Sequence, residues 1–102
     1  MAYRIAGIDV HKKMVAVAIA DVEVVGTWRF ERRQIGTSPS PLRALAEWLV
    51  EREVDEVVME STAQYWRPVW EALERAWRAA SAIRSARDVV RFLHPEAVHS
   101  LR

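Results

Sequence analysis

The sequence predicts one α/β domain on a mixed sheet, with its elements in the order β-β-β-α-β-α. Two short apolar runs, over residues 3–10 and 14–20, have strand length and are rich in Val, Ile and Ala. Between positions 42 and 50 the hydrophobic spacing changes to three and four residues, which is typical of an amphipathic helix. A chain of 102 residues, 51% of them hydrophobic, is long enough for one compact core and too short for two.

The first two runs are joined by "HKK", a polar connection of hairpin length. A third run, "VEVVGTWRF" over 22–30, alternates between apolar and polar residues and predicts a further strand. We therefore expect three antiparallel strands at the start of the domain.

A helix should follow, because Ser40 can cap it and Pro41 suits its first turn. Residues 54–61, "VDEVVMES", predict a fourth strand. Pro68 then introduces a second helix with an inward stripe formed by Val69, Trp70, Leu73, Ala76, Trp77 and Ala80.

The pattern becomes less regular after Ala80. Ile83, Ala86, Val90 and Leu93 keep helical spacing until Pro95 interrupts it, and arginines lie beside them. We therefore divide the chain into a domain over 1–80 and a divergent, basic, helical tail over 81–102, and we expect the sheet to be incomplete at its C-terminal end.

Composition excludes several classes of function. The chain has no cysteine, so disulfide scaffolds, thiolate metal sites and cysteine nucleophiles are excluded. A net charge of +1 does not by itself indicate nucleic acid or membrane as a partner. No run of eighteen apolar residues and no signal peptide is present, so we expect a soluble, cytoplasmic protein without membrane contact.

Asp9 and Glu60 are the candidate metal ligands. A helical crossover would place the fourth strand parallel to the first, and both carboxylates would then lie at the carboxyl edge of the sheet, where ligands bind in open α/β sheets. Two converging carboxylates need a cation between them, and Mg²⁺ prefers oxygen ligands. The alternative is structural, because Asp9 can cap its turn and Glu60 can belong to a helix cap.

A second group of residues suggests nucleic-acid contact. His11, Lys12 and Lys13 form a cationic turn beside Asp9 that could meet phosphates, although an ordinary polar turn explains them as well. Tyr65 and Trp66 could stack on bases, whereas Trp70 and Trp77 have the helical spacing of core residues.

Two stretches together resemble a known family. "GIDVHKKMVAVAI" and, about fifty residues later, "VVMESTAQYWRPVWEALE" resemble the N-terminal part of insertion sequence 110 family transposases, over roughly residues 3–75. The resemblance implies an RNase H-like (RuvC-like) domain in which four acidic residues bind divalent metal. Asp9 matches the first-strand aspartate of the family and Glu60 its fourth-strand glutamate. DNA and a guide RNA are the implied partners, and a later domain of the family carries a serine nucleophile.

The tail departs from that family. A fifth strand and the last two acids, three residues apart, have no visible match, because Asp88 is followed three positions later by Arg91. Two metal ions on one phosphate need more ligands than two carboxylates. We therefore expect that this chain alone does not catalyse transposition.

Two functions remain open at this point. The first is a transposase N-terminal domain, for DNA transposition and recombination, with a partial magnesium site and nucleic-acid binding. The alternative is a non-catalytic interaction or dimerisation module of the same fold, binding a second copy or other transposase subunits. An actin-like nucleotide-binding domain is disfavoured, because the chain has only three glycines and no phosphate-cradling loop.

Overall fold

The computed structural model describes residues 3–22, 28–80 and 85–93. Its elements are β1 (Tyr3–Val10), β2 (Met14–Val22), β3 (Trp28–Gly36), α1 (Pro39–Glu51), β4 (Glu56–Ser61), α2 (Trp66–Ala80), α3 (Ala86–Val89) and β5 (Val90–Phe92). They form a sheet in the order β3-β2-β1-β4-β5. The β1–β2 and β2–β3 pairs are antiparallel, whereas β1–β4 and β4–β5 are parallel. The predicted mixed α/β sheet is confirmed.

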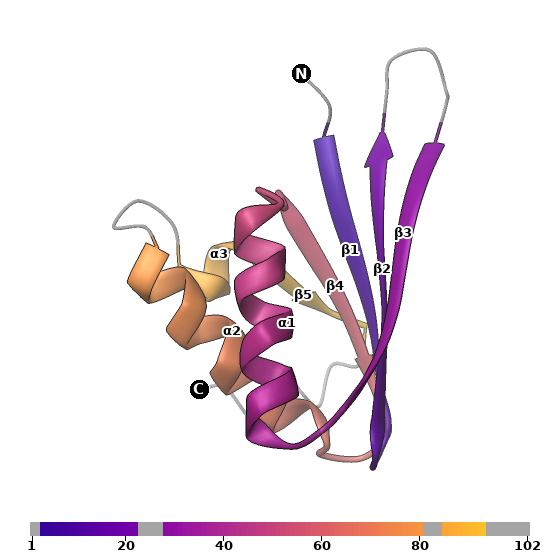
Figure 1. Cartoon of the computed structure of the whole chain (residues 1–102), viewed down its shortest axis with the longest axis vertical. Coiled ribbons are helices and arrows are strands. Elements are labelled where there is room, and N and C mark those ends of the chain that lie inside the picture. The colour runs from indigo at the N-terminus through magenta and orange to yellow at the C-terminus, as the bar shows by residue number, and fades with distance from the viewer. Residues whose placement is uncertain (1–2, 23–27, 81–84, 94–102) are drawn as a thin grey trace.

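One face of the sheet is covered by α1 and α2, which lie side by side (Figure 1). Alternate residues of the three central strands point into this layer and are buried, including Ala6, Ile8, Val10, Val17 and Met59. The other face, which we call the open face, carries none of the described helices (Figure 1). Residues that alternate with the buried ones, such as Gly7 and Asp9, therefore lie on the open face.

The two long helices supply the other half of the core. Leu42, Leu45 and Leu49 of α1 are buried, and α2 buries Trp66, Val69, Trp70, Leu73 and Trp77. Two of the six residues of the predicted α2 stripe are less buried than expected, because Ala76 is partly exposed and Ala80 is exposed. Within the part of the chain that the structure describes, each helix is too short or too polar to span a lipid bilayer.

The C-terminal end of α1 is closed by backbone hydrogen bonds. Val54 N–H donates to Leu49 O at 3.3 Å, and Glu53 N–H donates to Val50 O at 3.0 Å. This is a Schellman motif, which requires a left-handed residue after the cap, and Glu53 has a φ of 53°. A glutamate therefore occupies a conformation that normally favours glycine.

The start of β1 is anchored to the segment before β4. Arg4 N–H donates to Asp55 Oδ2 at 2.8 Å, and Asp55 N–H donates to Arg4 O at 2.9 Å. The Arg4 guanidinium donates to Asp21 Oδ1 at 2.6 Å and also reaches Arg52 O. The contacts of Arg4 with Asp55 and Arg52 hold β1 in register with β4, and its contact with Asp21 ties β1 to β2.

Two strand predictions are corrected. The third strand was expected over 22–30, but β3 is Trp28–Gly36, and residues 23–27 of the expected run lie outside the described residues. β3 is an edge strand, and most of its side chains from Glu31 onward are exposed. Its sequence "ERRQIG" is therefore mostly polar, and a search for apolar runs does not detect it.

The sheet also has the fifth strand that the sequence did not indicate. Of the expected helical tail, only Ala86–Val89 is helical within 85–93, and Val90–Phe92 pairs in parallel with β4. Val90 and Phe92 favour a strand, but three residues are too few to show a period of two against a helical spacing. The domain boundary at residue 80 remains a prediction.

Candidate functional site

Asp9 and Glu60 are brought together by the parallel pairing of β1 and β4. They are register partners on adjacent strands, which in sheets lie about 4.8 Å apart. Their neighbours Ile8, Val10 and Met59 are buried on the helix-covered side, so both carboxylates emerge on the open face. Both residues are exposed.

Backbone contacts fix the strand ends that carry these carboxylates. Thr62 N–H donates to Val10 O at 3.0 Å and extends the β1–β4 pairing beyond Glu60. His11 N–H donates to Met14 O at 2.9 Å and closes the turn between β1 and β2. The positions of Asp9 and Glu60 are therefore set by main-chain hydrogen bonds on both strands.

The predicted cationic turn lies directly beside Asp9. His11 Nε2 donates to Asp9 Oδ2 at 2.9 Å, and Lys12 and Lys13 are exposed in the same turn. Thr37 Oγ1 donates to Lys12 O at 3.2 Å and holds the turn against the end of β3. A carboxylate has two oxygens, so the bond to His11 leaves Asp9 Oδ1 for another ligand.

A shallow hollow of about 630 Å³ on the open face adjoins the two carboxylates. Its floor includes Gly7 and Ala18, which are register partners, and the next cross-strand row carries Ala16 and Asp9. Because the side chains of Gly7, Ala16 and Ala18 are small, the surface is hollowed above these positions. Asp9 and Glu60 lie in the wall of this hollow.

Arg32 and Gln34 of β3 also line the hollow, and sequence reasoning missed them. Arg32 pairs with Ala18 and Gln34 pairs with Ala16, so both lie in the same cross-strand rows as the floor. Arg32 and Gln34 are two positions apart, so in a strand they lie on the same face. This could be inferred from the sequence only if β3 were known to begin at Trp28. These two residues place one cation and one amide opposite the carboxylates.

The prediction that Tyr65 and Trp66 stack on bases is corrected for Trp66. Tyr65 is 37% exposed and stays available for stacking, but Trp66 is only 3% exposed. The Trp66 ring packs edge-on against Phe92, with 5.2 Å between the centroids. Trp66 is therefore a core residue that joins α2 to β5, and the structure contradicts a base-stacking role for it.

The described residues contain no group of three or more His, Asp or Glu side chains arranged for a metal ion. Asp88 is used elsewhere, because its Oδ2 accepts hydrogen bonds from Ser85 N at 3.1 Å and from Ser85 Oγ at 3.2 Å at the start of α3. Two carboxylates on one face fit a single Mg²⁺ ion, which usually keeps several waters and needs only one or two protein carboxylates. They do not fit a two-metal centre.

Comparison with solved structures identifies the fold. Thermus thermophilus RuvC in complex with a Holliday junction substrate matches with a TM-score of 0.61 and 18% identity, over 95% of this chain and 69% of that one. The fold is RNase H-like. An Aquifex aeolicus member of the Ppx/GppA family matches with a TM-score of 0.55 and 22% identity, over 94% of this chain.

The yeast mitochondrial Holliday junction resolvase matches with a TM-score of 0.54 and 13% identity, over 96% of this chain and 55% of that one. This RNase H-like chain spans 36% of the length of the Aquifex protein. No protein-family model matches the sequence, and no curated protein does.

Proposed function

We propose that this chain is the N-terminal domain of a DNA transposase that resembles the insertion sequence 110 family, and that it binds nucleic acid on its open face. The observation that carries the proposal is the register pairing of Asp9 with Glu60 on that face. Each carboxylate belongs to one of the two sequence stretches that resemble the family. The RNase H-like fold is compatible with this function and does not decide it.

The surroundings of the carboxylates support a nucleic-acid ligand. Lys12 and Lys13 are exposed in the turn that follows β1 and Asp9, and Arg32 lines the hollow itself. Positively charged side chains beside a shallow hollow can bind a phosphate backbone, and phosphate contacts dominate the affinity of most protein–nucleic-acid complexes. DNA and a guide RNA are the partners that the family resemblance suggests.

Asp9 and Glu60 would together hold one Mg²⁺ ion, which would offset their negative charge and attract phosphate oxygens. His11 orients Asp9 through the 2.9 Å hydrogen bond to its Oδ2. Because the described residues supply no second acidic pair, we expect the isolated chain to bind nucleic acid without cleaving it. A Mg²⁺-dependent strand break that disappears in Asp9→Ala would contradict this expectation.

The metal site is tested by titrating Mg²⁺ into isotopically labelled protein and following the backbone amide signals. We expect shifts confined to the neighbourhoods of Asp9 and Glu60, and we expect them to be lost in Asp9→Asn. Glu51→Gln is the matched control, since it removes one exposed carboxylate on α1. Equal shifts in Asp9→Asn and in the unmodified protein would place the ion elsewhere.

Nucleic-acid binding is tested by fluorescence anisotropy with a four-way DNA junction and a structured RNA, over a range of salt concentrations. Lys12→Glu/Lys13→Glu should weaken binding and reduce the logarithmic salt dependence by about 1.8 for duplex DNA, if each lysine meets one phosphate. Arg78→Glu/Arg87→Glu changes the charge equally on α2 and α3 and should leave binding unchanged. No binding of either nucleic acid at low salt would favour the interaction module instead.

A further inference from the structure

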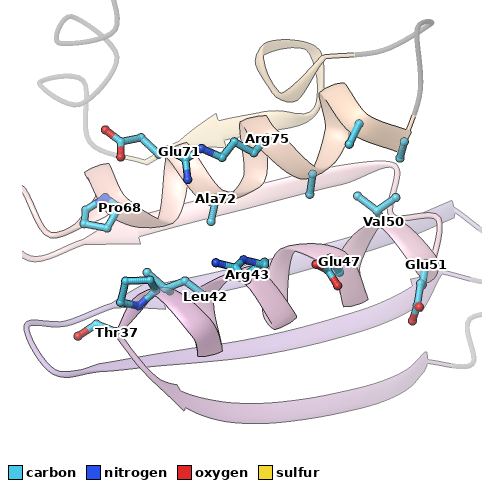
Figure 2. Close-up of a pocket in the computed structure, with 14 residues that line it drawn as sticks. Thr37, Leu42, Arg43, Glu47, Val50, Glu51, Pro68, Glu71, Ala72 and Arg75 are labelled. Carbon is cyan, nitrogen blue, oxygen red and sulfur yellow. The ribbon is translucent and has the colours of Figure 1, made fainter.

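A groove between α1 and α2 lies on the side of the molecule opposite to the open face. It has a volume of about 670 Å³. Its apolar lining includes Leu42, Val50, Pro68, Ala72, Ala76 and Ala79. Figure 2 shows Arg43 and Glu47 along the α1 side and Glu71 and Arg75 along the α2 side. This interhelical groove shares no lining residue with the hollow on the open face.

The charges on the groove follow the same spacing on both helices. Arg43 and Glu47 are four positions apart on α1, and Glu71 and Arg75 are four positions apart on α2. Residues four apart lie one above the other on one helix face. Each side of the groove therefore carries a cation and an anion one helical turn apart, and these four residues, which we call the paired charges, are exposed. Glu51 adds one further anion on the α1 side.

This pattern is complementary to itself. A twofold axis across two antiparallel copies of α1 places Arg43 of each copy against Glu47 of the other, and α2 can pair in the same way through Glu71 and Arg75. An entirely acidic or entirely basic partner would meet like charges on both helices, and such contacts oppose binding. Nucleic acid is opposed by the acids Glu47, Glu51 and Glu71.

We propose that the interhelical groove is a homodimer interface, in which two copies of this chain pack their α1–α2 faces antiparallel across a twofold axis. The alanines of α2 let the partner backbone approach closely, because helix separation depends on the side chains at the contact. The two helices are about 20 Å long, and the face they form is about 20 Å wide. Such a face buries about 800 Å² over the two copies, which is below the range of standard specific interfaces, so we expect a weak dimer that dissociates readily on dilution.

The test uses two complementary charge variants followed by analytical ultracentrifugation. Arg43→Glu/Arg75→Glu makes the four paired charges acidic, and Glu47→Arg/Glu71→Arg makes the same four basic while Glu51 stays unchanged. Each variant alone should dissociate at least about tenfold more readily than the unmodified chain, and an equimolar mixture should form a heterodimer. Arg67→Glu/Arg78→Glu, on α2 outside the groove, is the matched control and should dimerise normally.

Three results would overturn the proposal. The unmodified chain could stay monomeric at hundreds of micromolar, the two charge variants could dimerise like the control, or the mixture could fail to associate although circular dichroism shows both variants folded. If a charge variant does not fold, the chain's lack of cysteine offers a second test. A short thiol cross-linker should join two copies of Ala76→Cys and not of Ala44→Cys, and equal or absent cross-linking at both positions would refute the interface.

The outcome is independent of the proposed nucleic-acid function. The groove variants leave Asp9, Glu60 and the cationic turn intact. A monomer that binds nucleic acid would refute the dimer alone, and a dimer that binds none would refute the nucleic-acid function alone.

Discussion

Replacing Gly7 by alanine should make the domain more stable and its nucleic-acid binding weaker. Gly7 lies within β1, and a Cβ added there meets no atom within 4 Å. The new methyl group therefore costs no steric strain, and it restricts the unfolded chain. Such a change stabilises a protein by about 0.4–1 kcal/mol.

The expected gain is measurable by thermal unfolding. For a domain of this size, 1 kcal/mol corresponds to about 4–8 °C in Tm, so Tm should rise by about 2–8 °C. Gly36→Ala is the matched control, because Gly36 also has open space at its Cβ position but lies outside the hollow. Both variants should therefore be stabilised.

Only Gly7→Ala should weaken nucleic-acid binding, because only Gly7 belongs to the floor beside Asp9. Glycine within a strand often marks close approach of a ligand. The assay is the same anisotropy titration at fixed salt. A lowered Tm in Gly7→Ala would refute the described strand geometry, and equal affinity in the two variants would refute contact with the floor.

Three further predictions concern stability and are measured by urea unfolding. Trp66→Ala should lower the free energy of unfolding by about 3–5 kcal/mol, because Trp66 is buried against Phe92. Tyr65→Ala should change it by less than about 0.5 kcal/mol. Equal losses in the two variants would refute the assignment of Trp66 to the core. Glu53→Gly should stabilise the domain by about 0.5–1 kcal/mol, because Glu53 has a φ of 53°, and a loss of stability would contradict the Schellman ending of α1. Asp55→Ala should cost about 1–3 kcal/mol, because Arg4 N–H loses its 2.8 Å partner; an unchanged midpoint would show that water replaces the carboxylate.

Much of the fold was predictable because its central elements have clear hydrophobic patterns. β1 and β2 are short apolar runs, β4 is a third run rich in Val, and both long helices repeat their apolar residues at spacings of three and four. The crossover rule then makes β1 and β4 parallel. The two edge strands were predicted less well, because the third strand was expected over 22–30 and not over 28–36, and β5 was not expected at all. β3 is charged along the stretch "ERRQIG", and β5 has only three residues.

The candidate site was predictable where it depended on the central strands. Asp9 and Glu60 lie where the parallel pairing of β1 and β4 requires. Arg32 and Gln34 were missed because their face and register depend on where β3 begins. Trp66 was misplaced because a tryptophan in the first turn of a helix can point to the core or to solvent, and only its packing against Phe92 decides between them.

The pairing of β1 with β4 also bears on how the chain reaches its native state. Asp9 and Glu60 are 51 positions apart, so bringing them together costs about 3.5 kcal/mol of loop-closure free energy before any contact compensates. The β1–β2 hairpin closes over a short turn and needs no such closure. If β4 joins the sheet after the main folding barrier, the two carboxylates meet only late, and a bound divalent cation would act chiefly by slowing unfolding.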